Sequence, residues 1–355
     1  GPKMIQVLIA EDSGVARELL SHIINGQPDM QVIGTVCNGA AAIEAVKRLR
    51  PDIVVMDVNM PVLDGFEATR RLMESDPLPI VIVSAILNPN EVAATVQAVD
   101  AGALAFLEKP VSALHPRHAE LTKNFIQTVR LMAEVKVVRR RRFISRPAAA
   151  ARTATGIVIE RASLIAMGAS TGGPQVIQTI LSHLTPEVLP PILIVQHIAP
   201  GFIQGFVDWL AKTTKFPVCL ATPNEQPLPG RAYVAPDGYH LGVNVGGRLR
   251  LSTAPPENGL RPSVSYLFRS VNTVFGKNLV GVLLSGMGRD GALELKLLHD
   301  KGAITFAQDE ASAVIFGMPG EAVRLGAAKY ILPPEEIAYM LNKIFSGHEV
   351  KSSCH

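Results

Sequence analysis

Three polar residues in the second half of the sequence have the side-chain types that nucleophilic catalysis needs. Ser170 lies in the segment GASTG, residues 168–172, whose G-x-S-x-G spacing places a serine on a sharp turn between a strand and a helix. His197 directly follows the apolar run PILIVQ, and Asp290 lies in the loop after LVGVLLSG. A serine hydroxyl becomes a strong nucleophile when a histidine accepts its proton and a carboxylate orients that histidine. We therefore predict acyl transfer by a Ser-His-Asp triad.

The glycine-rich turn has an alternative role, which is phosphate binding. A P-loop needs Gly-Lys-Ser/Thr, which this turn lacks, and a dinucleotide-binding fold would place an acid where Gln196 and His197 stand. Taken singly, His197 also suits a hydrogen-bonded structural histidine, and Asp290 also suits a turn or a helix cap. Their combination at matching strand ends favours the triad, with backbone amides near Thr171 and Met287 as candidate oxyanion donors. The chain order Ser, His, Asp differs from that of ordinary α/β-hydrolases.

A second set of reactive residues follows the expected strands of the first half. Glu11 and Asp12 follow QVLIA, Asp57 ends DIVVMD, Ser84 lies near the end of PIVIVSA, and Lys109 ends ALAFLEK. The carboxyl ends of parallel strands meet at one edge of a sheet, where ligands bind. Each acid alone could cap the next helix, but carboxylates crowded at one edge predict Mg²⁺ held by Glu11, Asp12 and Asp57. We then expect Asp57 to accept a phosphoryl group, Lys109 to neutralise it and Ser84 to donate a hydrogen bond to it.

Short β-branched runs alternate with helical patterns through the first half of the chain. The expected strands lie at 6–10, 31–37, 52–57, 79–85 and 103–109. The expected helices lie at 15–26, 40–50, 66–75, 91–102 and from Asn124 to Val135. Five such repeats predict a doubly wound, flavodoxin-like parallel sheet of five strands, with right-handed crossovers and helices on both faces.

The alternation of strands and helices resumes in the second half. The expected strands lie at 163–168, 191–196, 230–235, 248–253, 279–286 and 303–308. The expected helices begin after Pro174 and lie at 202–212, 263–275 and 291–299. This pattern predicts a second doubly wound α/β domain.

Length and composition fit two domains joined by a basic linker. The chain has 355 residues, of which 48% are hydrophobic and 18% charged, as is typical of buried parallel sheets. The segment 136–161 carries eight Lys or Arg against one acid and interrupts the apolar periodicity. We therefore expect a first domain at 4–136, a flexible linker at 137–158, a second domain at 159–347 and a tail at 348–355.

Charge and hydropathy argue against nucleic-acid and membrane-spanning classes. The net charge of +3 is exceeded by the linker alone, so the rest of the chain is net acidic and has no broad basic face. The second half shows α/β alternation where a DNA-binding output would need a compact helical reader. No run approaches the roughly 20 apolar residues that cross a bilayer, and the N-terminus lacks the pattern of a secretory signal. We expect a cytoplasmic protein that does not bind nucleic acid.

The acidic edge and the segment DVNMPVLDG around Asp57 resemble the receiver domain of bacterial response regulators over residues 4 to about 136. The resemblance implies phosphorylation of Asp57 by a partner sensor histidine kinase. It also implies switch roles for Ser84, Phe106 and Lys109. Phe106 stands where many receivers carry Tyr, and taken alone it could equally be core packing.

The segments GASTGGP, QHI, GMGRDG and AQDEASAVIFGMP together resemble the catalytic domain of chemotaxis protein-glutamate methylesterases, the CheB family, over roughly residues 159 to 347. The resemblance implies that Ser170, His197 and Asp290 are catalytic and that no metal is needed in this second site. The implied substrates are γ-glutamyl methyl esters and certain glutamines on the cytoplasmic helices of chemoreceptors. One departure is Ser265, where the family often has Asp.

The two resemblances together imply a regulated enzyme at the periphery of receptor arrays. The unphosphorylated receiver is expected to cover the triad, and phosphorylation of Asp57 is expected to shift the population toward an open arrangement. Three alternatives stay open on the residues alone. They are a hydrolase of a related non-motility chemosensory pathway, a receiver with a DNA-binding output, and a receiver with a nucleotide-binding output.

Overall fold

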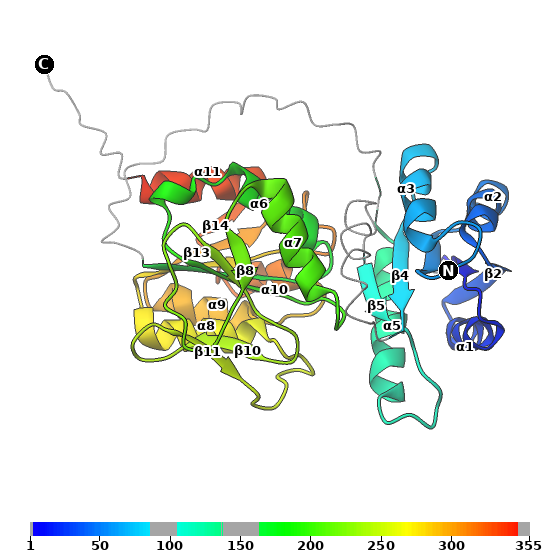
Figure 1. Cartoon of the computed structure of the whole chain (residues 1–355), viewed down its shortest axis with the longest axis horizontal. Coiled ribbons are helices and arrows are strands. Elements are labelled where there is room, and N and C mark those ends of the chain that lie inside the picture. The colour runs from blue at the N-terminus through cyan, green and yellow to red at the C-terminus, as the bar shows by residue number, and fades with distance from the viewer. Residues whose placement is uncertain (1–2, 86–104, 136, 138–162, 347–355) are drawn as a thin grey trace, which may run out of the picture. The chain divides into compact units, whose positions relative to one another are not determined.

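The computed structural model describes residues 3–85, 105–135, 137 and 163–346, which divide near residue 141 into two compact units (Figure 1). Three expected segments lie outside the described residues, apart from Val137: the linker at 137–158, the tail at 348–355 and the helix at 91–102. No helix in the described part of the chain is long and apolar enough to span a lipid bilayer.

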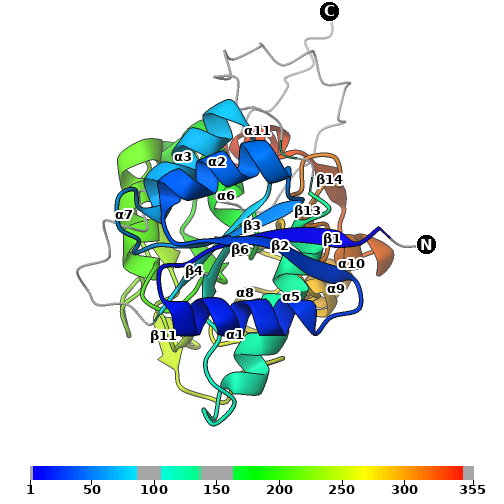
Figure 2. The ribbon, with the colours of Figure 1, turned by 90° about the vertical axis from the view of Figure 1, so that its right-hand side faces the viewer.

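The N-terminal unit is built around a parallel sheet with the strand order β2-β1-β3-β4-β5. Its strands are β1 (Ile5–Ala10), β2 (Met30–Val36), β3 (Ile53–Asp57), β4 (Ile80–Ser84) and β5 (Ala105–Glu108). Its described helices are α1 (Gly14–Asn25), α2 (Gly39–Leu49), α3 (Gly65–Ser75) and α5 (His118–Met132). Figure 2 shows α2 and α3 on one face of the sheet and α1 and α5 on the other. The doubly wound, five-stranded parallel sheet is thus confirmed.

Burial and helix capping explain why these elements form where they do. Every residue of β3 (IVVMD) and of β4 (IVIVS) is buried, as expected for strands that are covered on both faces. Ser13, Asn38 and Asp64 each accept a hydrogen bond from a backbone amide in the first turn of α1, α2 and α3. Such caps satisfy amides that have no partner inside the helix.

The C-terminal unit is built around a parallel sheet with the strand order β14-β13-β12-β6-β7-β9-β8. Its strands are β6 (Leu164–Ala169), β7 (Ile192–Gln196), β8 (Val218–Leu220), β9 (Ala232–Val234), β12 (Leu279–Leu283), β13 (Ile304–Gln308) and β14 (Tyr330–Leu332). Its helices are α6 (Gly173–His183), the 3₁₀ turn η2 (Pro186–Val188), α7 (Ile203–Thr214), α8 (Val264–Phe275), α9 (Ala292–Asp300), α10 (Met318–Arg324) and α11 (Pro334–Phe345). In Figure 1, α6 and α11 lie together on one side of the sheet, and α8 and α9 lie on the other. The predicted α/β class of this unit is confirmed.

Some elements differ from the sequence-based expectation. The run at 248–253 does form a strand, β11 (Leu249–Ser252), but it pairs antiparallel with β10 (His240–Val243) in a separate two-stranded sheet. Strands β8, β10 and β14 were not predicted, because three or four residues are too few to show a periodic pattern. Helices α10 and α11 were also missed. The helix expected from Asn124 to Val135 is α5, but both expected ends are wrong, since it begins at His118 and ends at Met132.

Candidate active site and phosphoacceptor site

Ser170 lies immediately after β6, on the turn that leads into α6. Its amide donates to the carbonyl of Ser285 at 2.9 Å, which ties the turn to the loop after β12. Gly172 has φ +81°, and a Cβ there would lie 2.6 Å from the Cβ of Val314, so this position requires glycine. Pro174 lies in the first turn of α6, where no amide donor is needed. The strand-to-helix turn that GASTGGP predicts is therefore present.

Strand pairing brings His197 next to this serine. Strands β6 and β7 are parallel neighbours, and Ala169 pairs with Gln196 at their ends. Ser170 and His197 are the residues that follow this pair, and the amide of His197 donates to the carbonyl of Ala169 at 2.9 Å. The two side chains therefore leave adjacent strands at the same level of the sheet.

Asp290 reaches the histidine from the loop after β12. Its Oδ2 lies 2.9 Å from His197 Nε2, and its side chain is buried. The first turn of α8 binds the same carboxylate. The amides of Val264 and Ser265 donate to it at 2.7 and 3.0 Å, and Ser263 Oγ donates to it at 3.0 Å. The negative charge thus also faces the positive end of the helix dipole.

The protonation state of Asp290 follows from these contacts. Burial alone would raise its pKa, but the adjacent His197 ring and the amides of Val264 and Ser265 outweigh burial and hold the pKa below the usual range of an aspartate. Asp290 is therefore ionised and favours a proton on Nε2 of the imidazole. The other ring nitrogen, Nδ1, is then the acceptor that remains for the proton of Ser170.

Ser170 Oγ and the His197 ring share no hydrogen bond among the described residues. Catalytic hydrogen bonds in ligand-free sites often tighten only when substrate binds. The structure thus pairs His197 with Asp290 and places Ser170 beside them. The catalytic roles of the three residues stay a prediction.

The two amides that we predicted as oxyanion donors lie close to the serine. Thr171 follows Ser170 in the chain, and Met287 follows Gly286, where an added Cβ would lie 2.6 Å from the Cβ of Ser170. Within the residues that the structure describes, the amides of Thr171 and Met287 have no hydrogen-bond acceptor. Free amides beside a nucleophile are available to bind a developing oxyanion.

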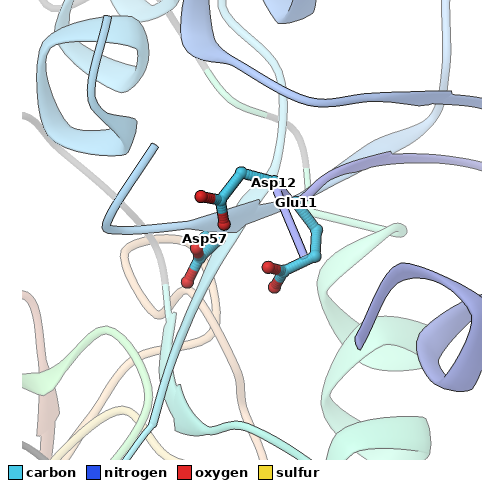
Figure 3. Close-up of side chains that lie close together, drawn as sticks. All are labelled: Glu11, Asp12 and Asp57. Atoms are coloured by element: carbon cyan, nitrogen blue, oxygen red, sulfur yellow. The ribbon is translucent and has the colours of Figure 1, made fainter. Parts of the chain in front are cut away.

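A second cluster lies at the carboxyl edge of the N-terminal sheet, as predicted (Figure 3). Carboxylate oxygens of Glu11, Asp12 and Asp57 all lie within 4.8 Å of one another. Lys109 Nζ lies 2.7 Å from Glu11 Oε2 and 3.0 Å from Asp57 Oδ1. The single charge of Lys109 does not balance three carboxylates, two of which are buried. Oxygen ligands with excess negative charge suit a divalent cation.

The pKa values at this cluster reflect burial and the charges of neighbouring groups. Burial raises the pKa of Asp57 to about 6, with a further rise from Glu11, although Lys109 opposes both. Burial would lower the pKa of Lys109, but its contacts with Glu11 and Asp57 raise it overall, so the amine stays charged. A divalent cation would supply the missing charge, so the residues present fit the expected Mg²⁺.

Ser84 and Phe106 lie on the two strands beside this acidic cluster. Ser84 is buried at the end of β4, donates its hydroxyl to the carbonyl of Ala85 at 3.1 Å, and accepts the amide of Lys109 at 2.7 Å through its own carbonyl. Phe106 lies on β5 and packs, partly buried, against the core of the N-terminal unit. Their switch roles therefore stay predictions.

Two residues of the C-terminal site were missed from the sequence. Ser263 caps α8 by accepting the amide of Tyr266, and a serine before the apolar helical run VSYLF is a recognisable N-cap signal. Gln196 is the first residue of the segment QHI, but we assigned it no role from the sequence. Ser265, the departure noted above, donates its hydroxyl to Glu294 at 2.7 Å and its amide to Asp290, so serine at this position still holds the carboxylate.

Comparisons with known proteins agree with the two domains. Residues 165–341 match the family model described as CheB methylesterase, and residues 7–119 match the response regulator receiver domain. A protein-glutamate methylesterase/protein-glutamine glutaminase 1 from Syntrophus aciditrophicus (strain SB) is 52% identical over 345 residues, which cover 96% of this chain and 98% of the relative. The enzyme with the corresponding name from Nitrosospira multiformis is 49% identical over 344 residues, covering 96% and 97%. The crystal structure of the Thermotoga maritima CheB methylesterase catalytic domain is 31% identical, has a TM-score of 0.50, and covers 51% of this chain and 98% of that one.

The fold and the two sites define a class of protein in which a receiver domain is joined to an α/β domain that carries a serine, a histidine and an aspartate at its strand ends. Within this class, the chain belongs to the CheB methylesterase family.

Proposed function

We propose that this protein is a phosphorylation-activated protein-glutamate methylesterase that also deamidates protein glutamines. The observation that carries the proposal is the contact between His197 and Asp290 beside Ser170, at neighbouring strand ends of the central sheet. Relatives with about half of their residues identical carry the corresponding name. The proposed substrates are methyl-esterified glutamates and certain glutamines on the cytoplasmic helices of chemoreceptors. These substrates would place the protein in the cytoplasm, at the periphery of receptor arrays.

The side-chain types of the three residues allow a chemically complete sequence of steps. His197 Nδ1 takes the proton of Ser170, whose Oγ attacks the ester carbonyl, while the amides of Thr171 and Met287 bind the oxyanion. The protonated imidazole, stabilised by Asp290, then gives its proton to the departing methanol. Water, activated by His197, hydrolyses the glutamyl ester on Ser170 and releases the carboxylate. A glutamine substrate loses ammonia in place of methanol.

The acidic cluster is the proposed point of control. Glu11, Asp12 and Asp57 would hold Mg²⁺, which when bound offsets the negative charge of the carboxylates and the phosphoryl group. Asp57 takes the phosphoryl group from a partner sensor histidine kinase. Lys109 pairs with the phosphorylated side chain, and Ser84 donates a hydrogen bond to it. Together with Phe106, Lys109 and Ser84 then transmit the effect of phosphorylation to the rest of the receiver domain.

Methanol release from methylated receptor membranes tests the proposal. We expect Ser170→Ala to abolish release and acetyl phosphate with Mg²⁺ to increase it. We expect Asp57→Asn to keep the resting rate and to lose the response to acetyl phosphate. Release by Ser170→Ala at the wild-type rate would refute the assignment of the nucleophile, and an activated Asp57→Asn protein would refute the assignment of the phosphoacceptor.

A further inference from the structure

Gln196, the last residue of β7, is a buried polar residue that the steps above do not use. It is 2% exposed. Its Nε2 donates to the carbonyl of Ser170 and to the carbonyl of His197, both at 2.8 Å. One side-chain amide therefore connects the backbone of the proposed nucleophile to the backbone of the proposed base.

The surroundings of Gln196 determine which way its amide points. If the amide were turned by 180°, Oε1 would face two carbonyl oxygens, and two hydrogen bonds would become two repulsive contacts. Oε1 has no hydrogen-bond partner among the described residues and packs against Gly173, where an added Cβ would lie 2.2 Å from it. The side chain thus fills the space between the end of β7 and the start of α6.

The two carbonyls depend on Gln196 to different degrees. The carbonyl of Ser170 also accepts the amide of Gly173 at 2.8 Å. For the carbonyl of His197, the only donor in the described part of the chain is Gln196. Loss of this amide would therefore release the backbone of His197 more than the backbone of Ser170, and would change the position of one relative to the other.

We propose that Gln196 is a positioning residue for hydrolysis, whose side-chain amide sets the distance and angle between Ser170 and His197. The assignment rests on the proposed function, because it takes Ser170 as nucleophile and His197 as base. Gln196 acts through the backbone carbonyls of Ser170 and His197, whose side chains carry out the proposed chemical steps. Misplacement of reacting groups by about 1 Å can lower a rate ~10²-fold.

Two variants of the full-length protein remove these bonds in different ways. Gln196→Glu keeps the shape of the side chain but offers only acceptors, and Gln196→Met keeps its approximate size without polar atoms. The matched control is Asn342→Leu on α11. The side-chain amide of Asn342 also connects two backbone groups, since it accepts from the amide of Thr185 at 2.9 Å and donates to the carbonyl of His183 at 2.8 Å.

A fluorophosphonate probe and methanol release together distinguish positioning from folding, with acetyl phosphate and Mg²⁺ present in both assays. The final extent of labelling counts the correctly folded sites, and the labelling rate constant reports how well Ser170 is activated. For both Gln196 variants we expect a labelling rate constant and a kcat per labelled site that are ~10²-fold lower, with KM little changed. For Asn342→Leu we expect wild-type values per labelled site.

Other outcomes would overturn the positioning role. A Gln196 variant that loses labelled sites but keeps the wild-type kcat per site would show that Gln196 only stabilises the fold. Ser170→Ala with wild-type methanol release would overturn the proposed function itself. Ser170→Ala without activity, combined with a fully active Gln196→Met protein, would overturn the positioning role alone.

Discussion

Three hydrogen-bond donors and the ring of His197 converge on Asp290, and they come from two separate parts of the chain. His197 approaches one oxygen, and the first turn of α8 contributes two amides and the hydroxyl of Ser263. An asparagine at this position would have the same size but would place an NH₂ group among these donors. It would also stop favouring the proton on Nε2 of His197.

The first prediction is therefore that Asp290→Asn lowers kcat for methanol release by about 10⁴-fold with little change in KM. Steady-state assays with methylated receptor membranes check it. A variant protein that keeps more than a tenth of the wild-type kcat would show that Asp290 is not the orienting carboxylate.

The second prediction concerns acid stability, because the pKa of Asp290 is lowered in the folded protein. The pKa of an aspartate in an unfolded chain is about 3.9. The stabilisation from the ionised folded carboxylate is thus complete above about pH 5 and is lost as the pH falls toward the lower folded pKa. We expect the difference in unfolding free energy between wild type and Asp290→Asn to be constant above about pH 5 and to shrink below about pH 4.

Urea unfolding followed by the fluorescence of Trp209 measures this difference. Trp209 is the single tryptophan of the chain and is buried in the C-terminal unit, so its emission reports unfolding of that unit. A difference in free energy that is the same from about pH 3 to pH 7 would contradict the prediction.

The sequence was informative about these residues where the chemistry requires one residue type. A serine between glycines, and a histidine and an aspartate after apolar runs, can be recognised by type and spacing. Gln196 could not be recognised in this way, because its contacts are to backbone carbonyls that any residue supplies. Its partner Gly173 could be seen in the sequence, but the close approach of Gln196 Oε1 that excludes a Cβ there is visible only in three dimensions.

At the scale of elements, the start of α8 belongs to the proposed hydrolytic site, because it binds Asp290. Ser263 caps this helix through the amide of Tyr266 and donates its hydroxyl to Asp290. The third prediction is that Ser263→Ala lowers stability by about 1 kcal/mol through the lost cap. We also expect kcat to fall about tenfold, because the buried carboxylate loses one donor.

The matched control for the third prediction is Asn38→Ala. Asn38 caps α2 in the N-terminal unit by accepting the amide of Ala41 at 2.8 Å. Loss of this cap should lower stability by a similar amount of about 1 kcal/mol, without a change in the resting rate of methanol release. If both variants have the same kcat, the contact between Ser263 and Asp290 has no role in catalysis.

The elements that were predicted well have a recognisable hydrophobic pattern in their own residues, whereas the pairing of the others depends on distant parts of the chain. Strands β3, β4, β6 and β12 are continuous buried runs between helices, so their type can be read from local sequence. Leu249–Ser252 also has strand-like residues, but nothing local specifies which strand it pairs with. Its pairing with β10 depends on the turn between the two strands and on the packing of β10 against α8.

At the scale of the whole molecule, the fourth prediction separates the two units by their need for metal. We expect EDTA to abolish activation by acetyl phosphate, because the carboxylates of Glu11, Asp12 and Asp57 then lack a counter-charge for the phosphoryl group. The resting rate of methanol release should stay unchanged in EDTA, since the proposed hydrolytic steps use protein groups alone. Methanol assays with EDTA, followed by added Mg²⁺, check both parts. A resting rate that falls in EDTA and recovers with Mg²⁺ would contradict the prediction.

The position of β6 at the centre of its sheet has a consequence for synthesis on the ribosome. Its neighbour β12 lies more than a hundred residues later in the chain. A nascent chain that has emerged only as far as His197 contains the proposed nucleophile and base, but one edge of β6 is still unpaired and Asp290 has not been synthesised. We therefore expect hydrolytic activity to appear only late in translation, after β12 has paired with β6 and Asp290 has been synthesised.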